Sequence, residues 1–165
     1  MSSPVEQITV VSSDGDEFKM TVAAAMQSEQ LKQMLTDDSI SIVKVPVENI
    51  STEILVKVIE YCQKHADHEA ATKANGGGAS DSEAEELNKW DAEFMKVDVE
   101  DKLFHILMAA NYLEIKGLFD LACQTVADLI KGKTPKQIRK IFNLKNDFTP
   151  EEQERLSRQH NCSFD

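Results

Sequence analysis

Apolar and polar positions alternate in two short segments near the start of the chain. ITVVSS at 8–13 and EFKMT at 17–21 show the two-residue period of half-buried strands, and the Asp14-Gly15 pair between them is typical of a tight turn. Together they predict a β-hairpin. Residues 22–35 predict a helix, because apolar residues near its end recur at three- and four-residue spacing. Alternation over 39–45, ended by a proline, predicts a third short strand.

The helical period dominates the rest of the chain. Ser51 is a candidate N-cap for a helix over 51–64, whose apolar positions form a single stripe. A second helix is predicted to begin at Asp98. A third runs from about Ile115 to Lys131, with Gly132 at the position where a left-handed residue ends many helices. The mixture of strands and helices predicts an α/β fold.

Two motifs in the C-terminal part of the sequence predict further helix N-termini. Thr134-Pro135-Lys136-Gln137 and Thr149-Pro150-Glu151-Glu152 both follow the pattern T-P-x-[QE]. In such a capping box the Thr side chain accepts a hydrogen bond, Pro suits the first helical position, and Gln or Glu returns a hydrogen bond to the cap. The repeats predict two short helices joined by residues 143–148.

The formal net charge of −11 over 165 residues is distributed unevenly. Residues 66–88 contain six acidic and one basic residue, three consecutive glycines and one large apolar residue, Leu87. A segment that polar cannot offset its ordering entropy by burial, so we predict a flexible, disordered acidic insertion. Residues 131–145 have the opposite character, with six basic and no acidic residues.

Composition also limits the function classes. The 41% hydrophobic content excludes a wholly disordered chain, while apolar runs of about five residues are too short for a membrane helix, which needs roughly 20. No signal-like apolar segment follows Met1, so we do not expect secretion. One basic segment in an acidic chain is a weak footprint for nucleic-acid binding. We therefore expect protein partners, with no membrane and no nucleic acid.

Candidate chemistry is sparse. Cys62, His65 and His68 could gather a metal at a helix end, but no fourth ligand is evident, so we expect no metal and no cofactor. No Ser or Cys lies in a recognisable nucleophile setting, and His105 on an apolar-rich helix is expected to be a packed or snorkelling residue rather than a base. Three scattered cysteines fit reduced thiols, hence a protein of the nucleus and cytoplasm.

The C-terminal third has more apolar residues than are needed to pack its predicted helices against the body on one side. The predicted helix at 115–131 is apolar on two sides: Leu118, Leu121, Ala122 and Leu129 on one, Phe119, Cys123, Val126 and Ile130 on the other. Helices of about ten residues, such as the two that follow, do not form a core alone. The surplus is explained either by internal packing or by a partner helix that docks on the second side.

Residues 109–152, AANYLEIKGLFDLACQTVADLIKGKTPKQIRKIFNLKNDFTPEE, closely resemble the SKP (S-phase kinase-associated protein) family, the adaptor subunits of SCF ubiquitin ligases. The resemblance extends back through WDAEFMKVD at 90–98, the helix at 51–64 and the opening hairpin. It implies a BTB/POZ-type α/β domain over 1–130, interrupted by the insertion at 66–88, and a C-terminal helical extension over 131–165. It also implies a non-catalytic adaptor that bridges a cullin scaffold to F-box substrate receptors for protein ubiquitination.

The resemblance further implies two sets of contact residues. For the cullin these are Asn111, Tyr112 and Val126. For F-box proteins they are Leu118, Cys123, Ile130, Ile138, Ile141, Phe142, Leu144, Phe148, Leu156 and Cys162. Sequence alone does not separate contact residues in these sets from purely structural ones. The alternative function is a BTB-type module that self-associates within another assembly.

One departure from the family pattern concerns the end of the chain. Family members usually end near an Asn-Gln-Trp sequence, whose indole ring closes over the F-box, whereas Cys162 stands here at the tryptophan position. Loss of an aromatic anchor at an interface costs on the order of 2–4 kcal/mol. We therefore expect the affinity for F-box proteins, or the choice among them, to differ from that of other family members.

Overall fold

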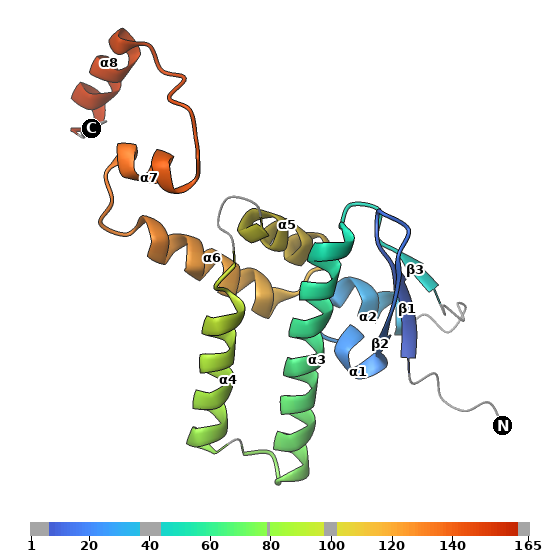
Figure 1. Ribbon diagram of the computed structural model, residues 1–165. Coiled ribbons are helices and arrows are strands. Elements are labelled where there is room, and N and C mark those ends of the chain that lie inside the picture. Colours follow the sequence, from blue (N-terminus) through green and yellow to red (C-terminus); the bar gives the residue numbers. More distant parts are fainter. Residues whose placement is uncertain (1–6, 37–43, 79, 98–101, 162–165) are drawn as a thin grey trace, which may run out of the picture.

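The computed structural model describes residues 7–36, 44–78, 80–97 and 102–161. A three-stranded sheet and a group of helices form the body, and two short helices extend beyond it (Figure 1). The elements, in chain order, are β1 Gln7–Val11, β2 Glu17–Thr21, α1 Val22–Ala25, α2 Glu29–Thr36, β3 Lys44–Pro46, α3 Thr52–Ala74, α4 Asp81–Phe94, α5 Phe104–Tyr112, α6 Lys116–Ile130, α7 Pro135–Ile141 and α8 Pro150–His160.

The predicted hairpin is confirmed. β1 pairs antiparallel with β2, with Val10 opposite Phe18, and Gly15 has the positive φ of +90° that the tight turn needs. β3 pairs parallel with the other edge of β1, which gives the order β2-β1-β3. β3 covers the end of the predicted third strand, and residues 39–43 of that prediction lie outside the described residues.

The single helix predicted over 22–35 is wrong, because two helices occupy this segment. α1 ends at Ala25 and α2 begins at Glu29. The cause is Ser28, which is fully buried between them: its hydroxyl donates to the carbonyl of Leu113 and accepts from the backbone N–H of Leu31 at 3.2 Å. Ser28 thus acts as a buried cap for α2, and it also ties this corner of the body to the end of α5.

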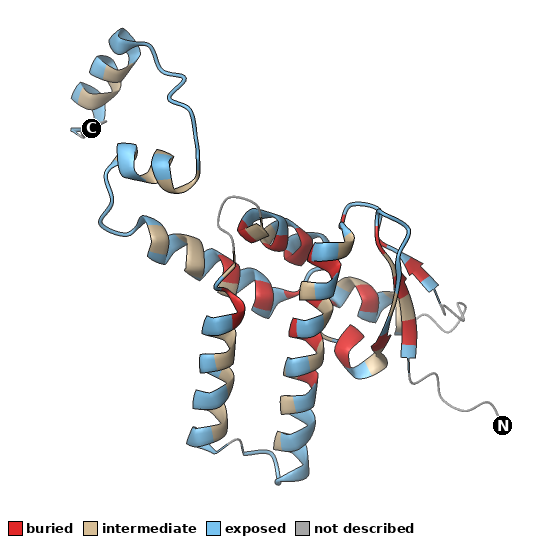
Figure 2. Cartoon of the chain, in the orientation of Figure 1, coloured by how far each residue is buried: buried red, intermediate tan, exposed pale blue. Residues whose placement is uncertain are grey.

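The core lies where the sheet, α1, the first half of α3, α5 and the first half of α6 meet (Figure 2). Ile8, Val10 and Val45 cover one face of the sheet, and Ile106 and Leu118 are fully buried among the helices. Figure 2 shows that burial stops partway along α6 and along the α3–α4 pair. Buried residues are therefore concentrated between the sheet and the adjoining helices, and the side of the body toward the C-terminal helices is left uncovered.

The start of α3 differs in detail from the prediction. Ser51 occupies the N-cap position, but its side chain makes no capping hydrogen bond. The carboxylate of Asp14, in the hairpin turn, accepts instead from the backbone N–H of Thr52 at 2.8 Å. The hairpin turn, for which the sequence indicates only a local role, therefore also supplies the cap of α3, 38 residues further along the chain.

The disordered insertion predicted over 66–88 is wrong for most of its length. α3 continues to Ala74 and α4 begins at Asp81, so the two helices form a hairpin that projects from the body (Figure 1). The segment is rich in Ala and Glu, which favour helices even where they bury little. Ser80 and Glu83 form a reciprocal capping box that begins α4.

Aromatic contacts hold the base of α4 against α3. The ring centroids of Tyr61 in α3 and Phe94 in α4 lie 5.8 Å apart, and those of His65 in α3 and Trp90 in α4 lie 6.4 Å apart, edge to face. His65 and Asp91 hydrogen-bond at 2.8 Å between the two helices, with side chains only 18% and 15% exposed. A hydrophobic and polar contact together therefore fix the α3–α4 hairpin at its base.

The C-terminal helix predictions are confirmed. α6 ends at Ile130, with Gly132 just beyond it at φ +70°. α7 and α8 each begin with a complete capping box, formed by Thr134 with Gln137 and by Thr149 with Glu152. No residue of either helix is buried. Among the described residues, no helix is long and apolar enough to cross a membrane.

Candidate functional site: two partner-binding surfaces

The outward face of α5 is the first uncovered surface of the body. Helical spacing puts Ile106, Ala109 and Ala110 on the buried side. The opposite side carries the residues that we call the α5 surface: Phe104, His105, Met108, Asn111 and Tyr112, all exposed. Met108 is 69% exposed at its centre and Tyr112 is 43% exposed at its end. Three large side chains in one stripe on a nine-residue helix are more typical of a docking site than of a solvated face.

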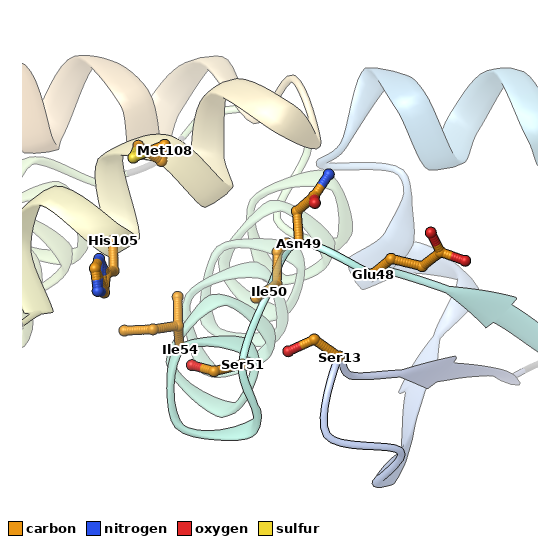
Figure 3. A pocket seen from close by; sticks show the side chains of 8 residues that line it. All are labelled: Ser13, Glu48, Asn49, Ile50, Ser51, Ile54, His105 and Met108. Atoms are coloured by element: carbon orange, nitrogen blue, oxygen red, sulfur yellow. The ribbon is translucent and has the colours of Figure 1, made fainter.

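Two hollows flank the α5 surface. The first, of about 300 Å³, lies between His105 and Met108 of α5 and the 48–51 segment that precedes α3 (Figure 3). Ile54 of α3 supplies an apolar wall. The second, of about 600 Å³, lies at the C-terminal end of α5, where Asn111 and Phe119 line it. A partner docked along α5 would therefore meet a ridge with a recess at each end.

The second uncovered surface begins on α6 and continues through the C-terminal helices. We call it the extension surface, and its members share incomplete burial and apolar character: Cys123, Ile130, Ile138, Ile141, Phe142, Leu144, Phe148 and Leu156. Leu144 and Phe148 are 58% and 49% exposed. Since no residue of α7 or α8 is buried, these helices have no core of their own. Helices this short are stabilised only by what packs against them.

One aromatic contact attaches the extension to the body. The rings of Phe104 and Phe142 meet edge to face, with centroids 5.2 Å apart and planes at 61°. An edge-to-face pair of this kind contributes about 0.5–1.5 kcal/mol beyond the area that it buries. Phe142 is the C-cap of α7, so this contact holds the end of α7 against the N-terminal end of α5. The remainder of the extension continues beyond the body (Figure 1).

The predicted contact residues divide between these surfaces, with two corrections, for Leu118 and Val126. Asn111 and Tyr112 lie exposed on the α5 surface. Leu118, predicted as an F-box contact, is fully buried in the core and is a structural residue. Val126 is partly buried against the core, and helical spacing groups it with Cys123 and the extension side of α6 rather than with α5. Cys162 lies outside the described residues.

Sequence reasoning missed the centre of the α5 surface. Of the two expectations for His105, packed or snorkelling, the packed one is wrong: His105 is exposed and lines the hollow of Figure 3, next to Met108. The signal was present: positions 104, 108, 111 and 112 share one helical face. Sequence alone does not distinguish that face from a buried one, because Phe104, Met108 and Tyr112 are large side chains of the kind that also fill cores.

The candidate metal ligands at the end of the 51–64 helix serve other roles. Cys62 is buried, and burial raises the pKa of its thiol to about 12, so it stays protonated and a poor ligand or nucleophile near neutral pH. His65 bonds to Asp91 of α4. Within the described part of the chain, no three His, Cys, Asp or Glu side chains are close enough to share a metal ion.

A small mixed sheet with helices and a helical extension that bears uncovered apolar residues define an interaction module. Comparison with known families assigns it: residues 6–67 match the domain described as Skp1 family, tetramerisation domain, and residues 116–162 match the Skp1 family, dimerisation domain. The chain belongs to the Skp1 family. This confirms the resemblance found in the sequence and the BTB/POZ-type fold expected from it.

Individual relatives span essentially the whole chain. SKP1-like protein 1 of Oryza sativa subsp. japonica is 51% identical over 169 residues, which cover 97% of this chain and 96% of the relative. SKP1-like protein 1A of Arabidopsis thaliana is 47% identical over 160 residues, with 97% and 98% covered. SKP1-like protein 4 of Arabidopsis thaliana matches from end to end at 44%. These relatives favour the adaptor role over a self-associating module of another assembly.

Proposed function

We propose that this chain is a non-catalytic adaptor of an SCF ubiquitin ligase, which bridges a cullin scaffold to F-box substrate receptors. The observation that carries the proposal is the extension surface: two capped helices without one buried residue, whose apolar side chains lie uncovered. Short helices that are strongly capped but bury no residue are expected to pack against a partner, which then covers their apolar side chains. The F-box is the partner that family membership suggests.

The α5 surface is the proposed cullin contact. Asn111 and Tyr112 lie at its C-terminal end and Met108 at its centre. Tyr112 combines a large apolar ring with a hydroxyl that stays in water, the character of an interface anchor. With the cullin on α5 and the F-box on the extension, both partners bind at once, and the adaptor supplies effective concentration and orientation. Ubiquitin transfer then takes place on other subunits.

A pull-down with an F-box protein and a cullin N-terminal domain tests the division of surfaces. We expect the natural chain to retain both partners. Asn111→Lys with Tyr112→Lys should abolish cullin binding and leave F-box binding within about twofold, because the two charges would be buried unpaired at one interface only. Circular dichroism checks that the variant is folded.

Val56→Lys is the matched control, since Val56 is an exposed apolar residue, 44% accessible, on α3 and outside both surfaces. It should leave both interactions intact. Absence of binding to either partner by the natural chain at micromolar concentration would refute the adaptor function. Loss of both partners in a folded double variant would refute the division of surfaces. We further propose that the protein acts in nucleus and cytoplasm, which a fluorescent fusion in living cells would test.

A further inference from the structure

The basic residues of this acidic chain are concentrated beside the extension surface. Lys131, Lys133, Lys136, Lys140 and Lys145 are all exposed, and no acidic residue interrupts residues 131–145. Lys133, Gln137, Lys140 and Ile141 line a hollow of about 390 Å³ on α7. The hollow thus sets two ammonium groups next to an apolar wall, in a chain whose formal net charge is −11.

The charges in this hollow are not neutralised within the described part of the chain. Ion pairs there engage Lys32, Lys44, Lys57, Lys96, Lys102 and Arg158, but neither Lys133 nor Lys140. α8, the next helix, carries three carboxylates in its first two turns. Glu152 accepts from the N-cap backbone and Glu154 pairs with Arg158, and none of the three forms an ion pair with these lysines in the described part of the chain. This chain has more acidic than basic residues, yet these two lysines have no carboxylate partner among the described residues. They are therefore available to pair with a carboxylate of a partner protein.

The hollow also adjoins the apolar face of α7. Ile138, Ile141 and Phe142 share one side of the helix, and Gln137 and Lys140 follow at its edge by helical spacing. Ile141 belongs both to the extension surface and to the hollow. A helix that packs on the apolar side would therefore place its own flank over Lys133 and Lys140.

We propose that Lys133 and Lys140 form a specificity edge that favours F-box proteins whose docking helix carries carboxylates on the flank facing α7. The inference rests on the proposed function and adds a criterion for choice among F-box partners. Charges at the rim of an interface act mainly on the association rate and on the salt dependence, while apolar contacts hold the complex once it is formed. The edge thus sorts partners during encounter.

Association kinetics with two immobilised F-box domains test this proposal. One domain carries two Asp or Glu residues on the relevant helix flank, and the other is identical except for Asn or Gln there. At about 50 mM salt we expect the natural chain to associate roughly tenfold faster with the acidic domain. Lys133→Glu with Lys140→Glu should remove that preference and change dissociation by less than about twofold.

Lys73→Glu with Lys89→Glu is the matched control, because it makes the same change in net charge with exposed lysines of the α3–α4 hairpin. It should keep the preference for the acidic domain. Equal loss in both double variants, or an unchanged preference in the Lys133/Lys140 variant, would overturn the specificity edge while F-box binding itself stands. Salt-sensitive self-association of the chain alone, seen by sedimentation, would assign the lysines to a second copy and also overturn it. No binding by the natural chain would refute the proposed function as well.

Discussion

Replacing two leucines by alanine separates structural residues from contact residues in the C-terminal third. Leu118 is fully buried in the core, whereas Leu144 is 58% exposed between α7 and α8. For a buried leucine, truncation removes transfer energy and leaves a cavity, at a typical total cost of about 3 kcal/mol. In a chain of this length that corresponds to a fall in melting temperature of roughly 6–12 °C.

Leu144→Ala should have the opposite signature. The exposed side chain contributes little to folding, so we expect a change in the free energy of unfolding below about 0.5 kcal/mol. If an F-box covers the accessible 58% of the side chain, and full burial of a leucine stabilises by about 1.5–3 kcal/mol, the loss in binding is about 1–2 kcal/mol. The dissociation constant would then rise by roughly 5- to 30-fold.

Urea unfolding followed by the fluorescence of Trp90, together with calorimetric titration of an F-box domain, measures both quantities. Trp90 suits the purpose, because it is the only tryptophan and packs at the base of α4 against Phe94. The folded fraction of Leu118→Ala should bind the F-box with near-natural affinity. The assignment is refuted if Leu144→Ala destabilises the chain as much as Leu118→Ala does, or if Leu118→Ala weakens binding without loss of stability.

Two further predictions concern polar groups of the α3–α4 hairpin. Burial raises the pKa of the Cys62 thiol from about 9 to about 12 and also raises that of the Tyr61 hydroxyl. The unfolded chain releases these protons first, so the free energy of unfolding should fall above about pH 9, by about 1.4 kcal/mol per pH unit from Cys62 alone. Cys62→Ala should reduce that slope in urea unfolding, and an unaltered slope would contradict it. Asp91→Asn should cost about 1–2 kcal/mol and speed hydrogen exchange in α4, while exposed Glu93→Gln changes less than about 0.5 kcal/mol; equal effects would refute the role given to the His65 contact.

The elements that sequence predicted correctly are those with a local cause. The hairpin depends on Asp14-Gly15 and on the alternation around it, and α7 and α8 depend on capping boxes that span four residues each. In each case the interacting groups are neighbours in the chain, so spacing alone specifies the contact. The family resemblance then supplied the arrangement of these elements, which no local pattern contains.

Two of the errors have non-local causes, while the predicted insertion failed for a local one. The break between α1 and α2 depends on Ser28 reaching Leu113, 85 residues away. The helices that replace the predicted insertion depend on alanine-rich composition and on the Ser80 cap, which a charge-based criterion for disorder undervalues. Burial of Leu118 beside exposed Phe119 depends on which side of α6 meets the core. Periodicity shows that two apolar sides exist but not which one the fold covers.

The distribution of burial explains why this fold suits an adaptor. A chain of 165 residues has enough apolar residues for a core, but they are buried unevenly. The body has a buried core, whereas α7 and α8 are capped, apolar on one side and contain no buried residue. Strong caps lower the cost of ordering these helices when a partner arrives. The contact of Phe142 with Phe104 anchors the end of α7 at the N-terminal end of the α5 surface. The two proposed binding surfaces therefore meet at one aromatic pair, so truncation of Phe104 is the single change expected to weaken both.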